Sequence, residues 1–164
     1  MDINQKKLGR QTVAFACPPS IVGHANVVGK KEGEGPLAGH FDHIAQDDSF
    51  GEKSWEEAES AMQRLALSAA LNKAGRNTGG LDYLFGGDLL NQCIGSSFAV
   101  RGQDVPFLGL YGACSTMAEG LCLAAMVLDG GFGQWAAALT SSHFCSAERQ
   151  YRAPLEYGGQ RTPT

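Results

Sequence analysis

The chain has 164 residues, of which 43% are hydrophobic and 18% charged, a composition typical of one globular domain and not of a disordered chain. Its net charge of −4 offers no basic surface, so we expect no nucleic-acid partner. No apolar run approaches the roughly 18 residues of a membrane helix and no signal peptide opens the sequence, so we expect a cytosolic or peripherally attached protein. Five cysteines without a CxxC pair favour reduced thiols over a disulfide framework or a zinc site.

The first third of the chain predicts a hairpin-like segment with long loops, a strand over 21–28 and an exposed loop over 41–50. A helix is expected to begin at Ser54, because Glu57 stands at capping-box spacing from it. Gly75 would end this helix as a C-terminal cap. Its predicted apolar stripe consists of Trp55, Ala58, Met62, Leu65, Ala66 and Ala69.

Strands and helices alternate through the remainder. We expect strands over 81–85, 107–111 and 135–140, and helices over 91–100 and from Thr116 to Gly130. Ser115 or Thr116 would cap the last helix, with Glu119 completing a capping box from Thr116, and its apolar sequence predicts burial on most sides. Residues 147–164 read as polar and rich in turns.

This alternation predicts an α/β fold, a parallel sheet layered with helices. Ligands gather at the carboxyl ends of strands in such sheets. Three segments should meet there and form one rim, namely 88–92, 112–116 and 141–143.

Cys114 stands out among the cysteines because of its place at this rim. It follows an apolar strand and a Gly-Ala pair, and it precedes an apolar helix, so we expect it on a sharp turn at the helix N-terminus. The positive end of the helix dipole there favours a thiolate or a bound anion. A small buried thiol at a tight turn is the alternative.

Several sequence blocks, taken in order, resemble the stage V sporulation protein AD family, whose fold is thiolase-like. The blocks are Lys31–Leu37, Gly86–Gln92, Gly112–Thr116, Asp129–Phe132, Thr140–His143, Ala147–Gln150 and Glu156–Gln160. The resemblance implies the N-terminal half of a thiolase-like domain, with Cys114 at the position of the thiolase nucleophile. Because the family is roughly twice this length, we read the chain as a fragment or truncated product that covers one half-domain, 1–164.

What the resemblance implies is ligand binding without turnover. The family is associated with dipicolinic acid, alone or as its calcium chelate, with its uptake into the spore and with its release on germination. The implied setting is peripheral, at the spore inner membrane, beside membrane proteins of the same operon; neither a cofactor nor a metal-binding residue is implied. The alternative is a thiolase or ketoacyl-synthase type of acyltransferase, in which Cys114 would accept an acyl group.

The predicted ligand-binding residues are Cys114, Ser115 and Asp88, followed by Asn91 and Ser142. The two hydroxyl residues after Cys114 would cradle a carboxylate at the helix N-terminus. Asp88 would contact calcium or the pyridine ring, or would instead cap the segment that follows it. Asn91 would bind the ligand or close its loop, and His143 would be a local hydrogen-bonding residue in preference to a catalytic base.

A half-domain of this kind would expose a sheet edge and apolar surface that the second half covers. We therefore expect the isolated chain to dimerise or aggregate, and the thiolase-like fold itself implies a dimer.

Overall fold

The computed structural model describes residues 6–152, except for the side chains of Gln92 and Arg152. Within this range, three strands form a parallel sheet in the order β6-β5-β7. Their bounds are Tyr83–Gly87 for β5, Phe107–Gly109 for β6 and Ala136–Thr140 for β7. The register pairs Gly86 with Gly109 and Gly87 with Thr140, so all three strands end at the same edge.

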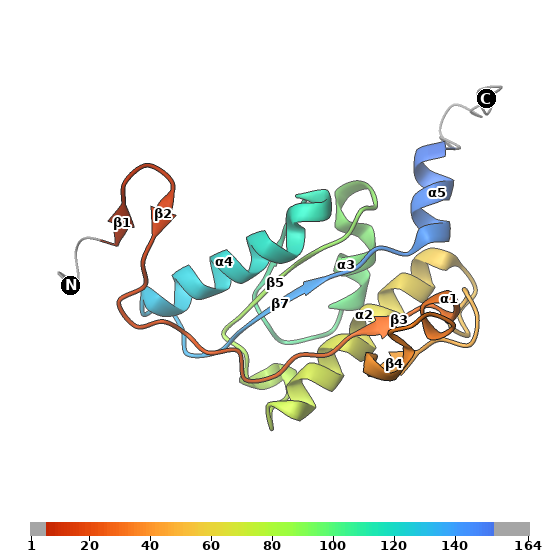
Figure 1. Cartoon of the computed structure of the whole chain (residues 1–164), viewed down its shortest axis with the longest axis horizontal. Coiled ribbons are helices and arrows are strands. Elements are labelled where there is room, and N and C mark those ends of the chain that lie inside the picture. The colour runs from red at the N-terminus through yellow and green to blue at the C-terminus, as the bar shows by residue number, and fades with distance from the viewer. Residues whose placement is uncertain (1–5, 153–164) are drawn as a thin grey trace.

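Helices cover both faces of this sheet, with α4 on one face and α2 and α3 on the other (Figure 1). Helix α2 spans Trp55–Lys73, α3 spans Ile94–Ala99 and α4 spans Thr116–Asp129. The predicted α/β class with a parallel sheet layered by helices is therefore confirmed.

Successive residues of β5 face opposite helices, as the two-residue period of a strand requires. Leu84 packs with Leu67 and Leu71 of α2, whereas Phe85 packs with Ala124 of α4. Leu84 and Phe85 are almost completely buried, and full burial of such a side chain contributes about 1.5–3 kcal/mol.

The predicted ends of α2 are confirmed. The Glu57 amide donates to Ser54 Oγ at 3.2 Å, although the Glu57 carboxylate returns to the Lys53 amide and not to that of Ser54. Beyond the other end, Gly75 has φ +66° and its amide donates to the Asn72 carbonyl. The Arg76 amide donates to the Leu71 carbonyl, which completes a Schellman motif.

Of the stripe predicted for α2, Ala58 is buried and Ala66 packs against the core, whereas Trp55, Met62, Leu65 and Ala69 are only half-buried. The buried residues of α2 are Ala58, Glu59, Ser60, Gln63, Leu67 and Leu71. The packed face thus carries polar side chains in its first half and leucines in its second. Ser60 Oγ donates to the Gly95 carbonyl at 2.9 Å, which ties α2 to α3.

Before α2 the predicted hairpin is present, whereas the predicted strand and loop differ from the structure. A hairpin joins β1, Lys7–Leu8, to β2, Thr12–Val13. The strand expected over 21–28 is reduced to β3, Val27–Val28, and it pairs in parallel with β4, His43–Ile44, outside the main sheet. The loop expected over 41–50 therefore contains a strand, and the short helix α1, Lys30–Gly33, lies between β3 and β4.

Two further predictions were wrong. The polar segment after β7 forms helix α5, Phe144–Arg152, although part of the same prediction, 153–164, lies outside the described residues. Helix α4 buries only Thr116, Gly120 and Ala124: Gly120 lies against Ala138 of β7, whereas Met117, Leu121 and Met126 are exposed. None of the described helices is both long and apolar enough to cross a membrane.

Candidate functional site

The turn that carries Cys114 has the predicted strand-to-helix geometry. After β6 the chain passes through a single 3₁₀ turn, Ala113–Ser115, and enters α4 directly. Ala113 has φ +49°, a left-handed conformation that costs an L-residue about 1–2 kcal/mol. The Cys114 side chain is exposed, so the alternative of a buried thiol is excluded.

Hydroxyl groups stabilise this turn, but not as the predicted capping box. Ser115 Oγ donates to the Gly112 carbonyl at 2.7 Å, and the Gly112 amide donates to Thr116 Oγ1 at 3.2 Å. The capping box from Thr116 to Glu119 was wrong, because the N-cap is Ser115, which makes no side-chain cap hydrogen bond, and Thr116 is already the first residue of α4. The side chains of the turn therefore brace its backbone, and the first amide of α4, that of Thr116, donates to the Ala113 carbonyl.

Asp88 is buried at the end of β5, with 1% of its surface exposed. Its Oδ1 accepts from the Leu90 amide at 2.9 Å, and its Oδ2 accepts from the Ser96 amide at 2.7 Å. The capping role that the sequence left open for Asp88 is therefore present. Its contact with a ligand stays a prediction.

Asn91 and Ser142 are both exposed, on the loops that follow β5 and β7. The Asn91 amide donates to Gln150 Oε1 at 2.9 Å, which attaches the β5 loop to α5. Helix α5 also reaches this edge through Tyr151, whose hydroxyl donates to the Leu89 carbonyl and lies 3.1 Å from the Tyr111 hydroxyl. The parallel sheet thus brings the predicted residues to one edge, and α5 joins them there.

His143 has the local role that the sequence favoured. Its Nε2 lies 2.7 Å from the Asp48 carbonyl, on the loop before α2. Cys145 Sγ lies 3.6 Å from the Asp48 carboxylate, and burial followed by this carboxylate raises the pKa of the Cys145 thiol. These contacts anchor the start of α5 to the loop before α2.

Glu59 is a buried residue of this region that the sequence analysis missed. It is 1% exposed on α2 and accepts hydrogen bonds from Ser141 Oγ at 2.5 Å and from Ser146 Oγ at 2.7 Å. The available signal was its spacing, because Glu59, Gln63, Leu67 and Leu71 form one i, i+4 row. The two leucines of this row mark it as the packed face.

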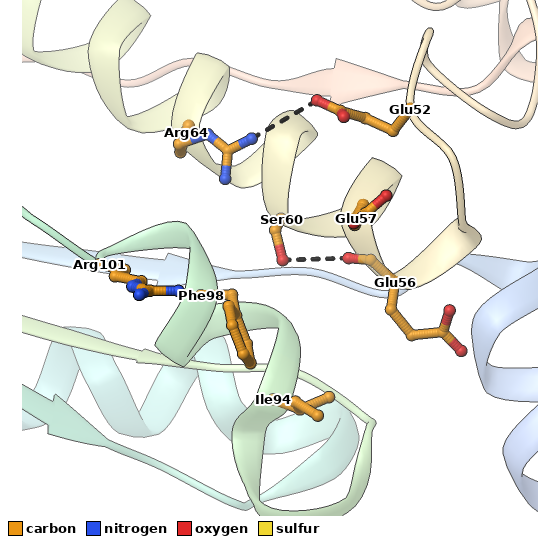
Figure 2. Close-up of a pocket in the computed structure, with 8 residues that line it drawn as sticks. All are labelled: Glu52, Glu56, Glu57, Ser60, Arg64, Ile94, Phe98 and Arg101. Carbon is orange, nitrogen blue, oxygen red and sulfur yellow. Dashed lines mark hydrogen bonds and ion pairs between the residues drawn. The ribbon is translucent and has the colours of Figure 1, made fainter.

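An open cavity of about 550 Å³ lies between α2 and α3, away from these residues (Figure 2). Ile94 and Phe98 of α3 face it from one side, and Glu52 and Arg64 lie on the other, 3.7 Å apart at their closest charged atoms. None of the predicted ligand-binding residues lines this cavity. The cavity and the sheet edge are therefore separate features of the described structure.

The sequence of the chain is similar to that of a known protein family. The model of the family described as Stage V sporulation protein AD (SpoVAD) matches residues 9–164. A curated protein, Stage V sporulation protein AD of Bacillus subtilis (strain 168), is 41% identical over 159 residues, which are 97% of this chain and 47% of the relative. The chain thus spans about half the length of the curated relative that it matches.

Two solved structures are similar to part of the chain. The priming β-ketosynthase of the R1128 polyketide biosynthetic pathway is 20% identical, with a TM-score of 0.47 over 55% of this chain and 29% of that protein. The 3-oxoacyl-(acyl carrier protein) synthase III of Xanthomonas oryzae is also 20% identical, with a TM-score of 0.48 over 72% of this chain and 41% of that protein. The family model, in contrast, matches nearly the whole sequence, and the chain belongs to the stage V sporulation protein AD family.

Proposed function

We propose that the protein binds dipicolinic acid, without turnover, and assists its uptake into the spore and its release on germination. The observation that carries this proposal is membership of the stage V sporulation protein AD family over residues 9–164. The resemblance to this family is what implies dipicolinic acid as the ligand. Cys114, Ser115 and Asn91 are exposed at one edge of the sheet, where ligands of parallel α/β folds collect.

The start of α4 supports an anionic ligand. A helix N-terminus presents unpaired N–H groups and the positive end of the dipole. Ser115, at the N-cap, makes no side-chain cap hydrogen bond there, and its hydroxyl donates to the Gly112 carbonyl. The Thr116 amide already donates to the Ala113 carbonyl, so it is the positive end of the α4 dipole, beside the Cys114 side chain, that suits one carboxylate of a pyridine dicarboxylate.

Calcium would enter with the ligand as its chelate. Two carboxylates in this region, Asp88 and Glu59, are buried and bound by protein donors. Negative charge beneath the edge disfavours a free dianion, and a bound cation would offset that repulsion. Titration with and without calcium distinguishes the two forms of the ligand.

The test is calorimetric titration of the full-length protein with dipicolinate. Cys114→Ala is the informative variant, and Cys122→Ala is its matched control, because Cys122 is also an exposed thiol and lies on α4. We expect saturable binding that Cys114→Ala weakens and Cys122→Ala leaves unchanged. Failure of the folded protein to bind, with an acyl thioester labelling Cys114 instead, would favour the acyltransferase alternative.

We also propose a peripheral position at the spore inner membrane, with a dimer and with membrane proteins of the same operon as partners. Exposed apolar side chains support a further protein contact: Leu108 on the edge strand β6, and Met117, Leu121 and Met126 on α4. Light scattering of the purified chain tests self-association. A clean monomer at micromolar concentration would contradict the dimer.

A further inference from the structure

Gln63 lies on the buried face of α2, one turn after Glu59, with 1% of its surface exposed. Its Nε2 lies 3.1 Å from Ser96 Oγ and 2.5 Å from Ser141 Oγ. Ser96 belongs to α3, which follows β5, whereas Ser141 directly follows β7. A single amide nitrogen therefore contacts both segments that leave this edge of the sheet.

The direction of these hydrogen bonds follows from the number of hydrogens available. Ser96 Oγ donates to Asp88 Oδ2 at 2.6 Å, and Ser141 Oγ donates to Glu59 Oε1 at 2.5 Å. A hydroxyl has one hydrogen, so each serine must accept from Gln63. The NH₂ group has two hydrogens, one for each serine. A flipped amide would set its oxygen against two oxygens that have no hydrogen left to give.

Both ends of this network are carboxylates, and both are buried. In the described part of the chain, every bond to Asp88 and Glu59 comes from a hydroxyl or a backbone N–H. Buried carboxylates depend on such donors, because desolvation leaves them no water. Gln63 orients the two hydroxyls toward the carboxylates, and it does so without adding a charge.

The same network reaches the segment that leads to Cys114. Cys93, just before α3, donates its thiol hydrogen to the Leu110 carbonyl at 3.0 Å, and Leu110 precedes the Cys114 turn. Gly87, at the end of β5, lies so close to this carbonyl that a Cβ on it would be 1.9 Å from the oxygen. A shift of α3 or of the end of β5 would therefore displace the Cys114 turn.

We propose that Gln63 is a positioning residue, whose carboxamide fixes the segments after β5 and β7 relative to each other and thereby sets the geometry of the Cys114 site. The inference rests on the proposed function for its ligand measurement. A second measurement, the rate at which iodoacetamide alkylates Cys114, requires no ligand.

The test compares Gln63→Met with Leu67→Met in the full-length protein. Both place a methionine on the same buried face of α2, but Leu67 belongs to the apolar core cluster and its side chain has no hydrogen-bonding group. We expect Gln63→Met to weaken dipicolinate binding by about tenfold. This is the change in affinity that corresponds to the loss of one hydrogen bond in a network that ends on charged groups. We also expect it to change the alkylation rate of Cys114, whereas Leu67→Met alters neither.

Unchanged binding and an unchanged alkylation rate in a folded Gln63→Met protein would overturn the inference. If Gln63→Met does not fold, Ser141→Ala takes its place, because it removes one arm of the network and keeps every donor to Asp88. Ser141→Ala should shift both readouts in the same direction, and no shift in either would overturn the inference. If the unmodified protein does not bind dipicolinate, the proposed function fails, and the alkylation rates alone decide the role of Gln63.

Discussion

Asp88 accepts two hydrogen bonds from Ser96, one from its amide at 2.7 Å and one from its hydroxyl at 2.6 Å. These bonds attach the first half of α3 to the end of β5, where the sequence placed a ligand-binding carboxylate. The Leu90 amide binds the other oxygen. Asp88 thus stabilises the loop whatever it binds.

Replacement of Asp88 with asparagine should lower the free energy of unfolding by about 2–3 kcal/mol. Both carboxylate oxygens accept from a backbone N–H, so the NH₂ of an asparagine must oppose one of these donors. Urea denaturation measures the change, with Asp104→Asn as the control, because Asp104 is exposed. Equal losses in the two variants would contradict the capping role.

Ala113→Gly should stabilise the protein by about 0.5–1 kcal/mol, in contrast to most replacements of alanine by glycine. The φ of +49° at Ala113 strains an L-residue, and this strain exceeds the backbone entropy that glycine adds to the unfolded chain. Ala124→Gly, in the interior of α4, is the control and should be destabilising. If thermal unfolding shows that both variants lose stability, the turn at Cys114 is not strained.

Asp129 should make stability depend on pH on the acid side. The hydrogen bond from Lys6, followed by that from the Cys17 amide, holds the pKa of the Asp129 carboxyl below its ordinary value of 3.8. A lowered folded-state pKa contributes stability that is complete above the ordinary value and is lost as the pH falls through the lowered one. The carboxylate should therefore hold the N-terminal segment against the end of α4 at neutral pH.

The comparison for this prediction is Asp129→Asn, studied by urea denaturation across the pH range. We expect the native protein to be the more stable at neutral pH, and the difference to narrow as the pH falls below 3.8. A difference that stays constant through this range would show that the ion pair with Lys6 contributes nothing to stability.

Local sequence signals predicted the ends of α2 and the parallel sheet of this protein. Ser54 and Gly75 mark the ends of α2, because a cap and a left-handed glycine depend on a few neighbouring residues. The alternation of strands and helices predicted a parallel sheet. Because the carboxyl ends of parallel strands lie at the same edge, this sheet in turn predicted that Cys114 and Ser142 lie at one edge. These inferences need only the sequence.

The tertiary structure decided which face of α2 is buried and what it binds. Glu59 and Gln63 read as surface residues in sequence. They are buried because serines from α3, from α5 and from the residue after β7 bind the Glu59 carboxylate and the Gln63 NH₂ group. Helix α5 forms from a polar segment for a similar reason, since Gln150 and Tyr151 bind the loop after β5. Such partners lie tens of residues away along the chain, so no local pattern could reveal them. The sequence by itself determined where Cys114 sits, and only the tertiary structure decided what holds the surrounding loops in place.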